Sequence, residues 1–362
     1  MRNPVTLAQV ARKAGVAIST ASMVLNDRPN TRISAATQQR VRHAARELGY
    51  RPRSARTRPR LHLVVGGVSA HPEPFENLAV VAAMQAEAAR ANATVQVVIV
   101  GQTAAAQREA LEALVEGRCD GLLVATRLEP EGLDWLLSRR VPVVLVGAAM
   151  ADPRCTSVHS DNYQGSGLLM DHLLRLGHRR IAFCGSCRDM TYEQQRYQCY
   201  VARCLEIGVV PAPHWVYWER ESQHSLEEWV ARLAPRRREP ECTAIFADQV
   251  QLGERVWHAL RRQGYRVPEE MSLVVFEEMR LGTPEAHPFT RVRCAPEAIA
   301  RLAVIRLLLE IATPDLPRVR MVLPTDFAQG TTAAPPPDSA VATEGDGDRP
   351  PLGGARIRAG TR

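Results

Sequence analysis

Lysine, aromatic residues and long apolar runs are scarce in this sequence. Lys13 is its single lysine, so 45 of its 46 basic residues are arginine, and aromatic residues make up 5% of the 362 positions. No segment reaches the roughly 18 consecutive apolar residues that a membrane-spanning helix requires. Residues 1–6 contain no apolar stretch of signal-peptide length. We therefore expect a protein that stays in the cytoplasm.

The motifs of several common enzyme classes are also missing. HExxH, GxSxG, a Walker loop and a GxGxxG after a strand do not occur in the sequence. Glu277 and Glu278 are adjacent carboxylates, but on a strand their side chains would face opposite sides, which is unsuitable for an acid–base pair. We therefore predict a protein without catalytic activity, without a cofactor and without a metal site.

The eight cysteines do not have the spacing of a typical zinc site. They lie at positions 119, 155, 184, 187, 199, 204, 242 and 294, and only Cys184 and Cys187 form a CxxC pair. A structural zinc site usually needs a second closely spaced pair. We expect reduced thiols that are mostly buried. A redox or metal role for Cys184, Cys187, Cys199 and Cys204 is the alternative.

The positive charge is concentrated near one end of the chain. Its 46 basic and 39 acidic residues give a formal net charge of +7. Between residues 40 and 60 there are eight arginines and one acidic residue, Glu47. The planar guanidinium group can bind a phosphate or a guanine through two N–H groups at once. This local excess favours a nucleic-acid partner over an ordinary solvated surface.

The chain divides into four parts by composition. Residues 1–50 have short helical patterns, and residues 51–60 form an arginine-rich linker. Residues 61–330 alternate apolar runs typical of strands with amphipathic helical patterns. Residues 331–362 are rich in Pro, Gly, Asp and Thr without periodicity, and we expect them to be disordered.

The first part predicts a helix-turn-helix unit. Residues 6–9, Thr-Leu-Ala-Gln, have the form of a capping box, and Gly15 provides the turn before a second helix at about 18–25. Ser34 is the expected cap of a third helix, whose inner face includes Val41. Two short helices that are joined at a glycine and supported by a third form the DNA-binding helix-turn-helix architecture.

The third part predicts two α/β lobes. Its apolar runs have the length of strands, and helical patterns separate most of them; the runs are 61–65, 95–100, 121–125, 141–147, 180–185, 243–247 and 272–276. Continuous apolar strands that alternate with helices indicate parallel sheets covered on both faces. Because the region is too long for one sheet, we predict two lobes with a ligand between them, at the carboxyl ends of the strands.

Several short motifs occur in a fixed order along the chain. They are residues 6–26, 47–52 (ELGYRP), 119–123 (CDGLL), 141–144 (VPVV), 160–162 (SDN), 176–183 (LGHRRIAF) and 264–272 (GYRVPEEMS). Together they resemble the lactose repressor/galactose repressor (LacI/GalR) family of bacterial transcription regulators over roughly residues 5–330. The resemblance implies a homodimer, with a tetramer as a further option, whose second helix enters the DNA major groove. It also implies a core that is similar to periplasmic sugar-binding proteins, with a small effector between its lobes.

The resemblance also implies which residues contact DNA. Ile18, Ser19 and Met23 would face base edges, whereas Thr20 and Ser22 suit phosphates. The full expected set is Thr6, Ala17, Ile18, Ser19, Thr20, Ser22, Met23, Asn26, Arg51, Arg53, Arg56 and Arg58. Ala17 stands where the family usually has a capping Ser or Thr, and Met23 where it commonly has Arg, so we expect more apolar base contacts, for instance with thymine methyl groups. The alternative is that Ile18 and Met23 only pack.

The linker departs most from the family pattern. In the family, a hinge helix after the Tyr-Arg-Pro motif inserts a leucine into the minor groove and bends the operator. Residues 51–60 are several residues shorter than this hinge and contain no leucine, and Pro59 would block a helix. We expect an extended arm that follows phosphates or an A·T-rich minor groove, with little DNA bending. A disordered basic tether is the alternative.

The resemblance places five residues in the effector cleft: Phe75, Asp161, Arg196, Asp248 and Glu277. Arg196 matches an arginine that binds ring hydroxyls or carboxylates, and Glu277 stands where the family has Asp. Ala247 replaces an amide, so we expect an effector that differs from simple hexoses and has an anionic or polyhydroxylated end. The alternatives are a surface ion pair for Arg196, a core position for Phe75 and a helix cap for Asp161. For His178 we expect a structural hydrogen-bonding role.

These observations predict a DNA-binding transcriptional regulator of the repressor type. Its expected partners are an operator duplex, a sugar-like or anionic effector and a second copy of the chain. The alternative is an effector-binding sensor whose degenerate hinge leaves it with weak or non-specific DNA binding.

Overall fold

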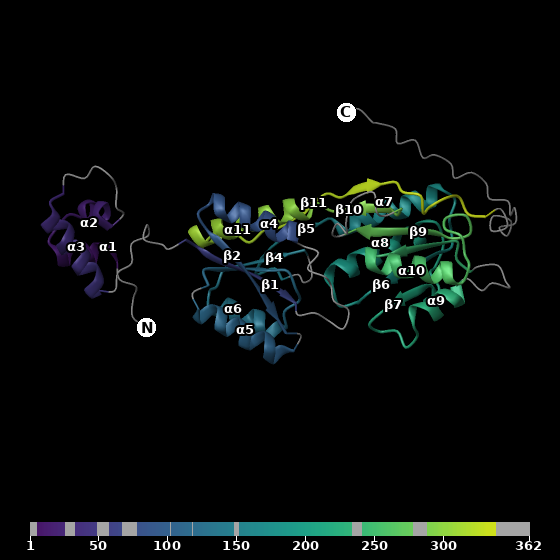
Figure 1. Ribbon diagram of the computed structural model, residues 1–362, viewed down its shortest axis with the longest axis horizontal. Coiled ribbons are helices and arrows are strands. Elements are labelled where there is room, and N and C mark those ends of the chain that lie inside the picture. The colour runs from purple at the N-terminus through teal and green to yellow at the C-terminus, as the bar shows by residue number, and fades with distance from the viewer. Residues whose placement is uncertain are drawn as a thin grey trace, which may run out of the picture.

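The computed structural model describes residues 6–25, 33–48, 58–66, 78–101, 103–117, 119–147, 152–233, 241–277 and 288–337. These residues form a helical head and two α/β lobes, which are seen from left to right in Figure 1. Among the described helices, none is long and apolar enough to span a membrane.

The head consists of three helices, as predicted. They are α1 (Leu7–Ala14), α2 (Ile18–Leu25) and α3 (Ala35–Leu48). Both hydrogen bonds of the capping box are present between Thr6 and Gln9, and Gly15 ends α1 with a φ of 65°, a conformation that glycine adopts without steric cost. Val10, Ala21 and Val41 are fully buried where the three helices meet. The predicted helix-turn-helix is therefore confirmed.

The first lobe is built on a parallel sheet with the strand order β11-β5-β4-β3-β1-β2. Helices α4 (Leu78–Arg90) and α11 (Pro296–Ala312) cover one face of the sheet, and α5 (Ala104–Glu116) and α6 (Pro130–Ser138) cover the other. The strands are β1 (Arg60–Gly66), β2 (Thr94–Val100), β3 (Gly121–Val124), β4 (Val143–Val146), β5 (Thr156–Ser160) and β11 (Arg320–Leu323). Because β1 begins at Arg60, the linker is one residue shorter than predicted.

The second lobe has a sheet with the order β12-β10-β9-β8-β6-β7, in which only β12 is antiparallel to its neighbour. Helices α7 (Asn162–Arg175) and α8 (Thr191–Glu206) cover one face, and α9 (Leu226–Leu233) and α10 (Val250–Arg262) cover the other. The strands are β6 (Ile181–Gly185), β7 (Val216–Trp218), β8 (Ala244–Ala247), β9 (Ser272–Glu277), β10 (Thr290–Arg293) and β12 (Asp326–Ala328), with a 3-10 turn at Pro213–Trp215. The two predicted lobes are therefore confirmed.

The chain crosses three times between the lobes. It passes from β5 to α7 at Asp161, from β10 to α11 at residues 294–295, and from β11 to β12 at residues 324–325. The Asp161 N–H donates to the Leu323 carbonyl at 2.8 Å, so the first and third crossings lie side by side. Because each crossing leaves a parallel strand at its carboxyl end, the carboxyl ends of both sheets meet between the lobes. We call this the interlobe region.

Several elements of the core were not predicted from the sequence, among them β5 and α11. Strand β5 carries Thr156, His159 and other polar residues, yet four of its five residues are buried. Buried polar side chains of β5 have hydrogen-bond partners elsewhere in the fold. The Thr156 hydroxyl, for example, donates to the buried Glu310 carboxylate of α11. Helix α11 is apolar on most sides and therefore has no helical periodicity that a sequence pattern could reveal.

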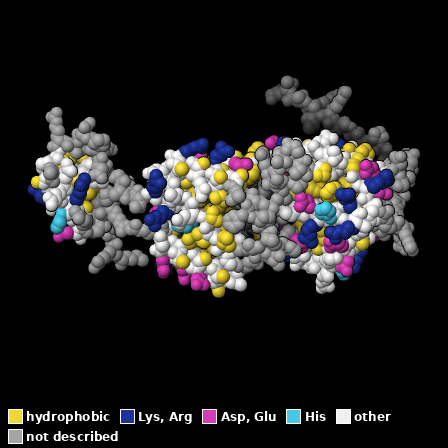
Figure 2. Space-filling view, in the orientation of Figure 1, with side chains coloured by type: hydrophobic (Ala, Val, Ile, Leu, Met, Phe, Trp, Pro, Cys, Tyr) yellow, Lys and Arg dark blue, Asp and Glu magenta, His cyan; other side chains and the backbone are white. Residues whose placement is uncertain are grey.

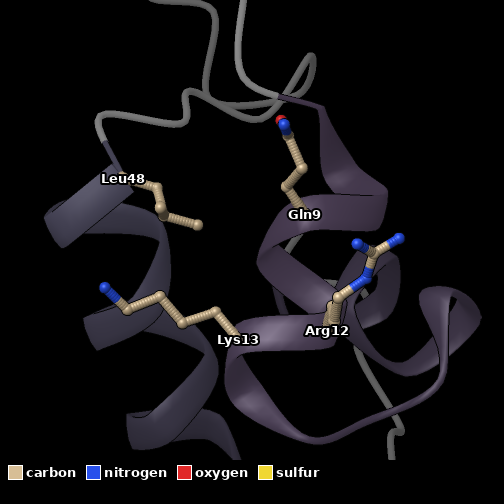
Figure 3. Close-up of a pocket in the computed structure, with 4 residues that line it drawn as sticks. All are labelled: Gln9, Arg12, Lys13 and Leu48. Carbon is tan, nitrogen blue, oxygen red and sulfur yellow. The ribbon is translucent and has the colours of Figure 1, made fainter.

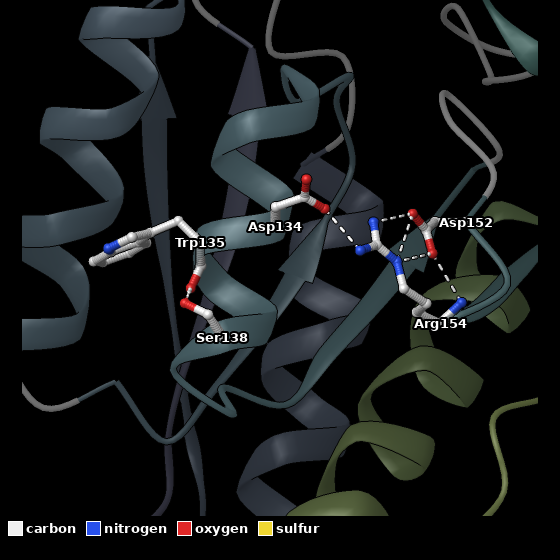
Figure 4. Close-up of polar contacts among 5 residues, drawn as sticks. All are labelled: Asp134, Trp135, Ser138, Asp152 and Arg154. Atoms are coloured by element: carbon white, nitrogen blue, oxygen red, sulfur yellow. Dashed lines mark hydrogen bonds and ion pairs between the residues drawn. The ribbon is translucent and has the colours of Figure 1, made fainter.

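An exposed arginine fixes the connection between β4 and β5 to helix α6. Arg154 binds Asp134 of α6 at 2.7 Å and Asp152 at 2.6 Å, as Figure 4 shows. The hydrogen bond from Arg154 holds the pKa of Asp152 below its usual range. On the same helix, the Ser138 hydroxyl donates to the Trp135 carbonyl at 2.7 Å, which satisfies a carbonyl in the last turn.

The predicted start of the disordered tail, at residue 331, is wrong by at least seven residues. Residues 331–337 run along the second lobe, and Thr332 is 2% exposed. The Leu273 N–H donates to the Thr332 carbonyl at 2.7 Å, and the Thr332 hydroxyl donates to the Leu273 carbonyl at 2.6 Å. The composition of the segment predicted disorder, because a local pattern does not reveal hydrogen bonds to a strand about 60 residues away in the sequence. Residues 338–362 lie outside the described residues.

His178 fastens this C-terminal segment to the second sheet. Its Nε2 donates to the Ala334 carbonyl at 2.8 Å, which leaves Nδ1 as the acceptor for the Thr243 hydroxyl at 2.8 Å. The ring is 1% exposed, and its burial lowers its pKa to about 4. The expected structural role of His178 is therefore confirmed.

Acidification is expected to destabilise the second lobe through His178. The unfolded chain binds a proton near pH 6.5 but the folded chain only near pH 4, so stability is constant above pH 6.5 and falls below it. Between pH 7.5 and pH 5 the expected loss is about 2 kcal/mol. Urea unfolding of the wild type and of His178→Gln at both pH values measures this. An equal pH dependence in both proteins would contradict the prediction.

Candidate functional site

Helix α2 presents an apolar and hydroxyl-bearing surface to solvent. Ile18 is 55% exposed and Met23 37% exposed, and Ser19 is also exposed. On the inner side of the helix, Ala21 and Val24 are buried against α1 and α3. Ile18 and Met23 therefore do not belong to the core of the head.

The other described candidates for DNA contact in the head lie on α2 or directly before α1 and α2. Thr6 is exposed at the start of α1, where its hydroxyl accepts from the Gln9 N–H at 3.4 Å. Thr20 and Ser22 are half-buried on α2, and Ala17 is exposed just before it. The remaining candidates Asn26, Arg51, Arg53 and Arg56 lie outside the described residues.

A basic depression next to α3 was missed by the sequence interpretation. It is lined by Gln9, Arg12, Lys13 and Leu48, whose side chains are drawn in Figure 3. Lys13 Nζ binds Glu47 at 2.9 Å, and this contact lowers the pKa of the Glu47 carboxyl. Arg12 and Lys13 lie in the last turn of α1, where cations also stabilise the helix dipole. Their position in the last turn of the predicted first helix, where basic residues are favoured, was the available signal.

The missing N-cap oxygen of α2 provides a simple stability test. The Ala17 carbonyl accepts the first helical hydrogen bond, from Ala21 N at 3.0 Å, so Ala17 occupies the cap position without a side-chain acceptor. Ala17→Ser is expected to stabilise the head by about 1 kcal/mol, because the hydroxyl satisfies a free N–H of the first turn. Circular dichroism melting of the head transition measures this, with Ala36→Ser, an exposed position inside α3, as the control. Equal shifts would contradict a capping effect.

Arg58 is bound to the base of the first lobe. Its Nε donates to the Asn92 side-chain oxygen at 2.8 Å. Asn92 lies in the turn between α4 and β2 and has a φ of 54°. Arg58 is thus placed apart from the α2 surface, although the sequence grouped it with the DNA-contacting residues.

In the interlobe region, Arg196 connects three of the elements that carry predicted effector residues. Its Nε and Nη2 donate to the Asn162 side-chain oxygen at 3.1 and 2.9 Å, and its Nη1 donates to the Asp248 carbonyl at 2.6 Å. The guanidinium stacks 3.8 Å from the centre of the Phe276 ring. Since Arg196 is fully buried, the surface ion pair considered as an alternative is wrong.

The predicted effector residues around Arg196 have different environments. Asp161 caps α7, because its Oδ1 accepts from the Gln164 N–H at 2.9 Å. Asp248 is fully buried at the end of β8. Glu277, at the end of β9, is 7% exposed and accepts from Arg291 Nε at 2.9 Å. Phe75 lies outside the described residues.

Three polar residues of the interlobe region were missed by the sequence interpretation. Asn162 and Arg291 bind Arg196 and Glu277, as described above. Glu193 is fully buried on α8 and accepts from the Cys187 N–H and, at 2.9 Å, from Gln249 Nε2. The SDN motif was the available signal for Asn162. The other two belong to no motif, and their roles arise only where separate strands and helices meet.

The cysteines behave as buried apolar residues. Six of the eight are buried, and all eight are free thiols. Burial raises the pKa of Cys155 to about 11 and the pKa of Cys199 and Cys204 to about 12, so these thiols stay protonated and poorly reactive. Among the described residues there is no group of three His, Cys, Asp or Glu side chains that could hold a metal ion.

Comparison with known proteins agrees with both parts of this structure. Residues 6–53 match the family model of bacterial regulatory proteins of the lacI family, and residues 170–332 match that of the periplasmic binding protein-like domain. The transcriptional regulator CelR of Thermobifida fusca is 30% identical, over 88% of this chain and 96% of the relative. GalR of Escherichia coli is 27% identical, over 91% and 96%. A solved CelR–cellobiose complex superposes with a TM-score of 0.67 at 25% identity, covering 91% of this chain and all of the other.

A helix-turn-helix head followed by a two-lobed periplasmic-binding-like core defines a DNA-binding transcriptional regulator that is controlled by an effector. The chain belongs to the LacI family of these regulators.

Proposed function

We propose that the protein is a homodimeric repressor that binds an operator duplex through helix α2 of each copy. The observation that carries this proposal is the outward exposure of Ile18, Ser19 and Met23 on a helix whose other side is buried. On the face shown in Figure 2, Lys and Arg side chains lie on the head and on both lobes, and acidic side chains gather at the lower edge of the first lobe. The basic side chains of the head favour its contact with DNA.

The proposed effector lies in the interlobe region and is a polyhydroxylated or anionic compound. Arg196, Asp248 and Glu277 come from three different elements that border the interlobe region, where a ligand between strand ends would lie. The cellobiose complex of CelR, a relative of similar fold, supports a carbohydrate-like effector. In this proposal the protein acts in the cytoplasm, binds its ligand without converting it, and needs neither cofactor nor metal.

The proposed linker arm is restricted to Arg51, Arg53 and Arg56, because Arg58 is held by Asn92. Without a leucine wedge, the operator is expected to bend little. The proposed DNA contacts of the head are otherwise those named from the sequence, with Arg12 and Lys13 added as phosphate contacts.

A mobility-shift experiment with the full chain and DNA from its own upstream region tests the proposed function. Ile18→Asp is expected to weaken binding at least tenfold, because it places a carboxylate against the base edges and phosphates. Val210→Asp is the matched control, since Val210 is an apolar residue that is 77% exposed on the second lobe. If the wild type binds DNA weakly and Ile18→Asp does not change its affinity, the result would favour the alternative, an effector-binding sensor with non-specific DNA binding.

Arg196→Ala is expected to abolish the effector response and leave operator binding intact. The response is measured as release of bound DNA by a panel of disaccharides, sugar acids and sugar phosphates. Arg203→Ala is the control, because Arg203 lies on the same helix but binds Asp171 and Glu206 on its outer side. If Arg196→Ala kept the wild-type response, Arg196 would not belong to the effector site.

A further inference from the structure

An ion pair joins the two lobes across the interlobe region. Arg127 follows β3 of the first sheet, and Asp189 follows β6 of the second. Arg127 Nη1 lies 3.4 Å from the Asp189 carboxylate and donates to the Asp189 carbonyl at 3.3 Å. One side chain thus reaches both the charged group and the backbone of the opposite loop.

The contact between Arg127 and Asp189 lies at a distance from the segments that connect the two lobes. In the first sheet, β3 is two strands away from β5, which carries the first crossing; in the second, β6 is three strands away from β10, which carries the second. With a strand spacing of about 4.8 Å, the contact lies roughly 10 to 14 Å from the crossings. A rotation about the crossings would therefore separate Arg127 from Asp189.

Within the first lobe, a buried side-chain amide forms two hydrogen bonds with the backbone of the loop that contains Arg127. Gln107 of α5 is 5% exposed. Its Nε2 donates to the Arg127 carbonyl at 3.2 Å, and its Oε1 accepts from the Glu129 N–H at 2.8 Å. The backbone on both sides of residue 128 is thereby fixed to its own lobe.

The loop of Asp189 is held in the same way within the second lobe. The buried Glu193 accepts from the Cys187 N–H, and Gln194 Nε2 donates to the Arg188 carbonyl at 2.9 Å. Arg188 also binds Glu221 at 3.1 Å. The two residues that meet across the lobes are therefore presented by two loops of restricted freedom, which reduces the entropy lost when they pair.

We propose that Arg127 and Asp189 form a latch that holds the two lobes in a closed arrangement and is released when the regulator changes state. The proposal rests on the proposed function, because an effector between the lobes requires an opening through which to enter and leave. Arg127 and Asp189 are 40% and 71% exposed, and exposed ion pairs contribute little stability. Such a contact biases the equilibrium between closed and open lobes and remains reversible.

Hydrogen–deuterium exchange of the full-length protein without ligand tests the latch. Arg127→Asp and Asp189→Arg are each expected to accelerate exchange in residues 125–129 and 186–190 up to about fivefold, the range of an exposed ion pair. The swapped double variant Arg127→Asp/Asp189→Arg is expected to restore protection in both segments. At 1 M salt, the wild type should approach the single variants, because screening weakens the pair.

Arg140→Asp is the matched control for Arg127→Asp. It makes the same charge change on the same lobe, but Arg140 follows the last turn of α6, at the end of the lobe away from the strand carboxyl ends. If the single variants exchanged like this control, or if the swap did not restore protection, the latch would be overturned. The readout uses neither DNA nor effector, so failure of the latch and failure of the proposed function give separate results.

Discussion

Arg291→Ala is expected to lower the free energy of unfolding of the second lobe by about 3 kcal/mol or more. Arg291 and Glu277 are 8% and 7% exposed, and Arg291 Nε donates to the Glu277 carboxylate at 2.9 Å. Removing one partner of a buried ion pair leaves the other charge in a poorly solvated site, which typically costs about 3–5 kcal/mol. Denaturation followed by tryptophan fluorescence measures the change, because four of the five tryptophans, at positions 215, 218, 229 and 257, lie in this lobe.

A neutral replacement of both residues separates the charge effect from simple loss of volume. Arg291→Met/Glu277→Gln removes both charges at similar side-chain size, so its loss is expected to be smaller than that of Arg291→Ala. A double variant that is less stable than the single variant would contradict this explanation. A single variant that loses less than about 1 kcal/mol would show that solvent or other groups compensate Glu277.

Affinity for duplex DNA is expected to fall about a thousandfold between 50 and 200 mM salt. The logarithm of the binding constant falls by about 0.9 per phosphate contact for each tenfold rise in salt, and a thousandfold loss over this range corresponds to roughly six contacts. Arg12, Lys13 and the linker arginines of two heads supply enough cations for this number. Fluorescence anisotropy at four salt concentrations measures the slope.

The same titration assigns part of the slope to the linker. Arg53→Ala/Arg56→Ala is expected to reduce the slope by about 0.9 for each phosphate that the arm no longer binds, whereas Arg139→Ala, an exposed arginine of the first lobe that stacks on Trp135, leaves it unchanged. A slope that the double variant does not change would contradict the arm and favour the disordered tether. A slope near zero in the wild type would exclude phosphate binding as the source of affinity.

Local signals in the sequence predicted the head and most of the core. The capping box at Thr6 and the turn at Gly15 depend on residues within one helical turn, so their pattern is visible without tertiary information. The seven predicted strands all occur, because fully buried parallel strands need continuous apolar runs. Strand β5 was missed since its polar side chains find buried partners far away in the sequence, such as Glu310.

The effector site could be predicted only in part. The family motifs pointed to Arg196, Asp248 and Glu277, and the structure brings their strands and helices together around Arg196. The pairing of Glu277 with Arg291 depends on the parallel register of β9 and β10, in which Arg291 lies opposite Val275. No spacing rule links two residues of neighbouring strands that are 14 residues apart in the sequence.

The sequence by itself determined the helix-turn-helix, the alternation of strands and helices and the excess of arginine near the head. Each of these is visible in residues that are close together in the chain. Only the tertiary structure decided which polar groups meet, as Arg127 with Asp189 and His178 with Ala334 illustrate. These pairs are 62 and 156 residues apart, and their energy depends on distance and solvent exposure, which the folded chain alone defines.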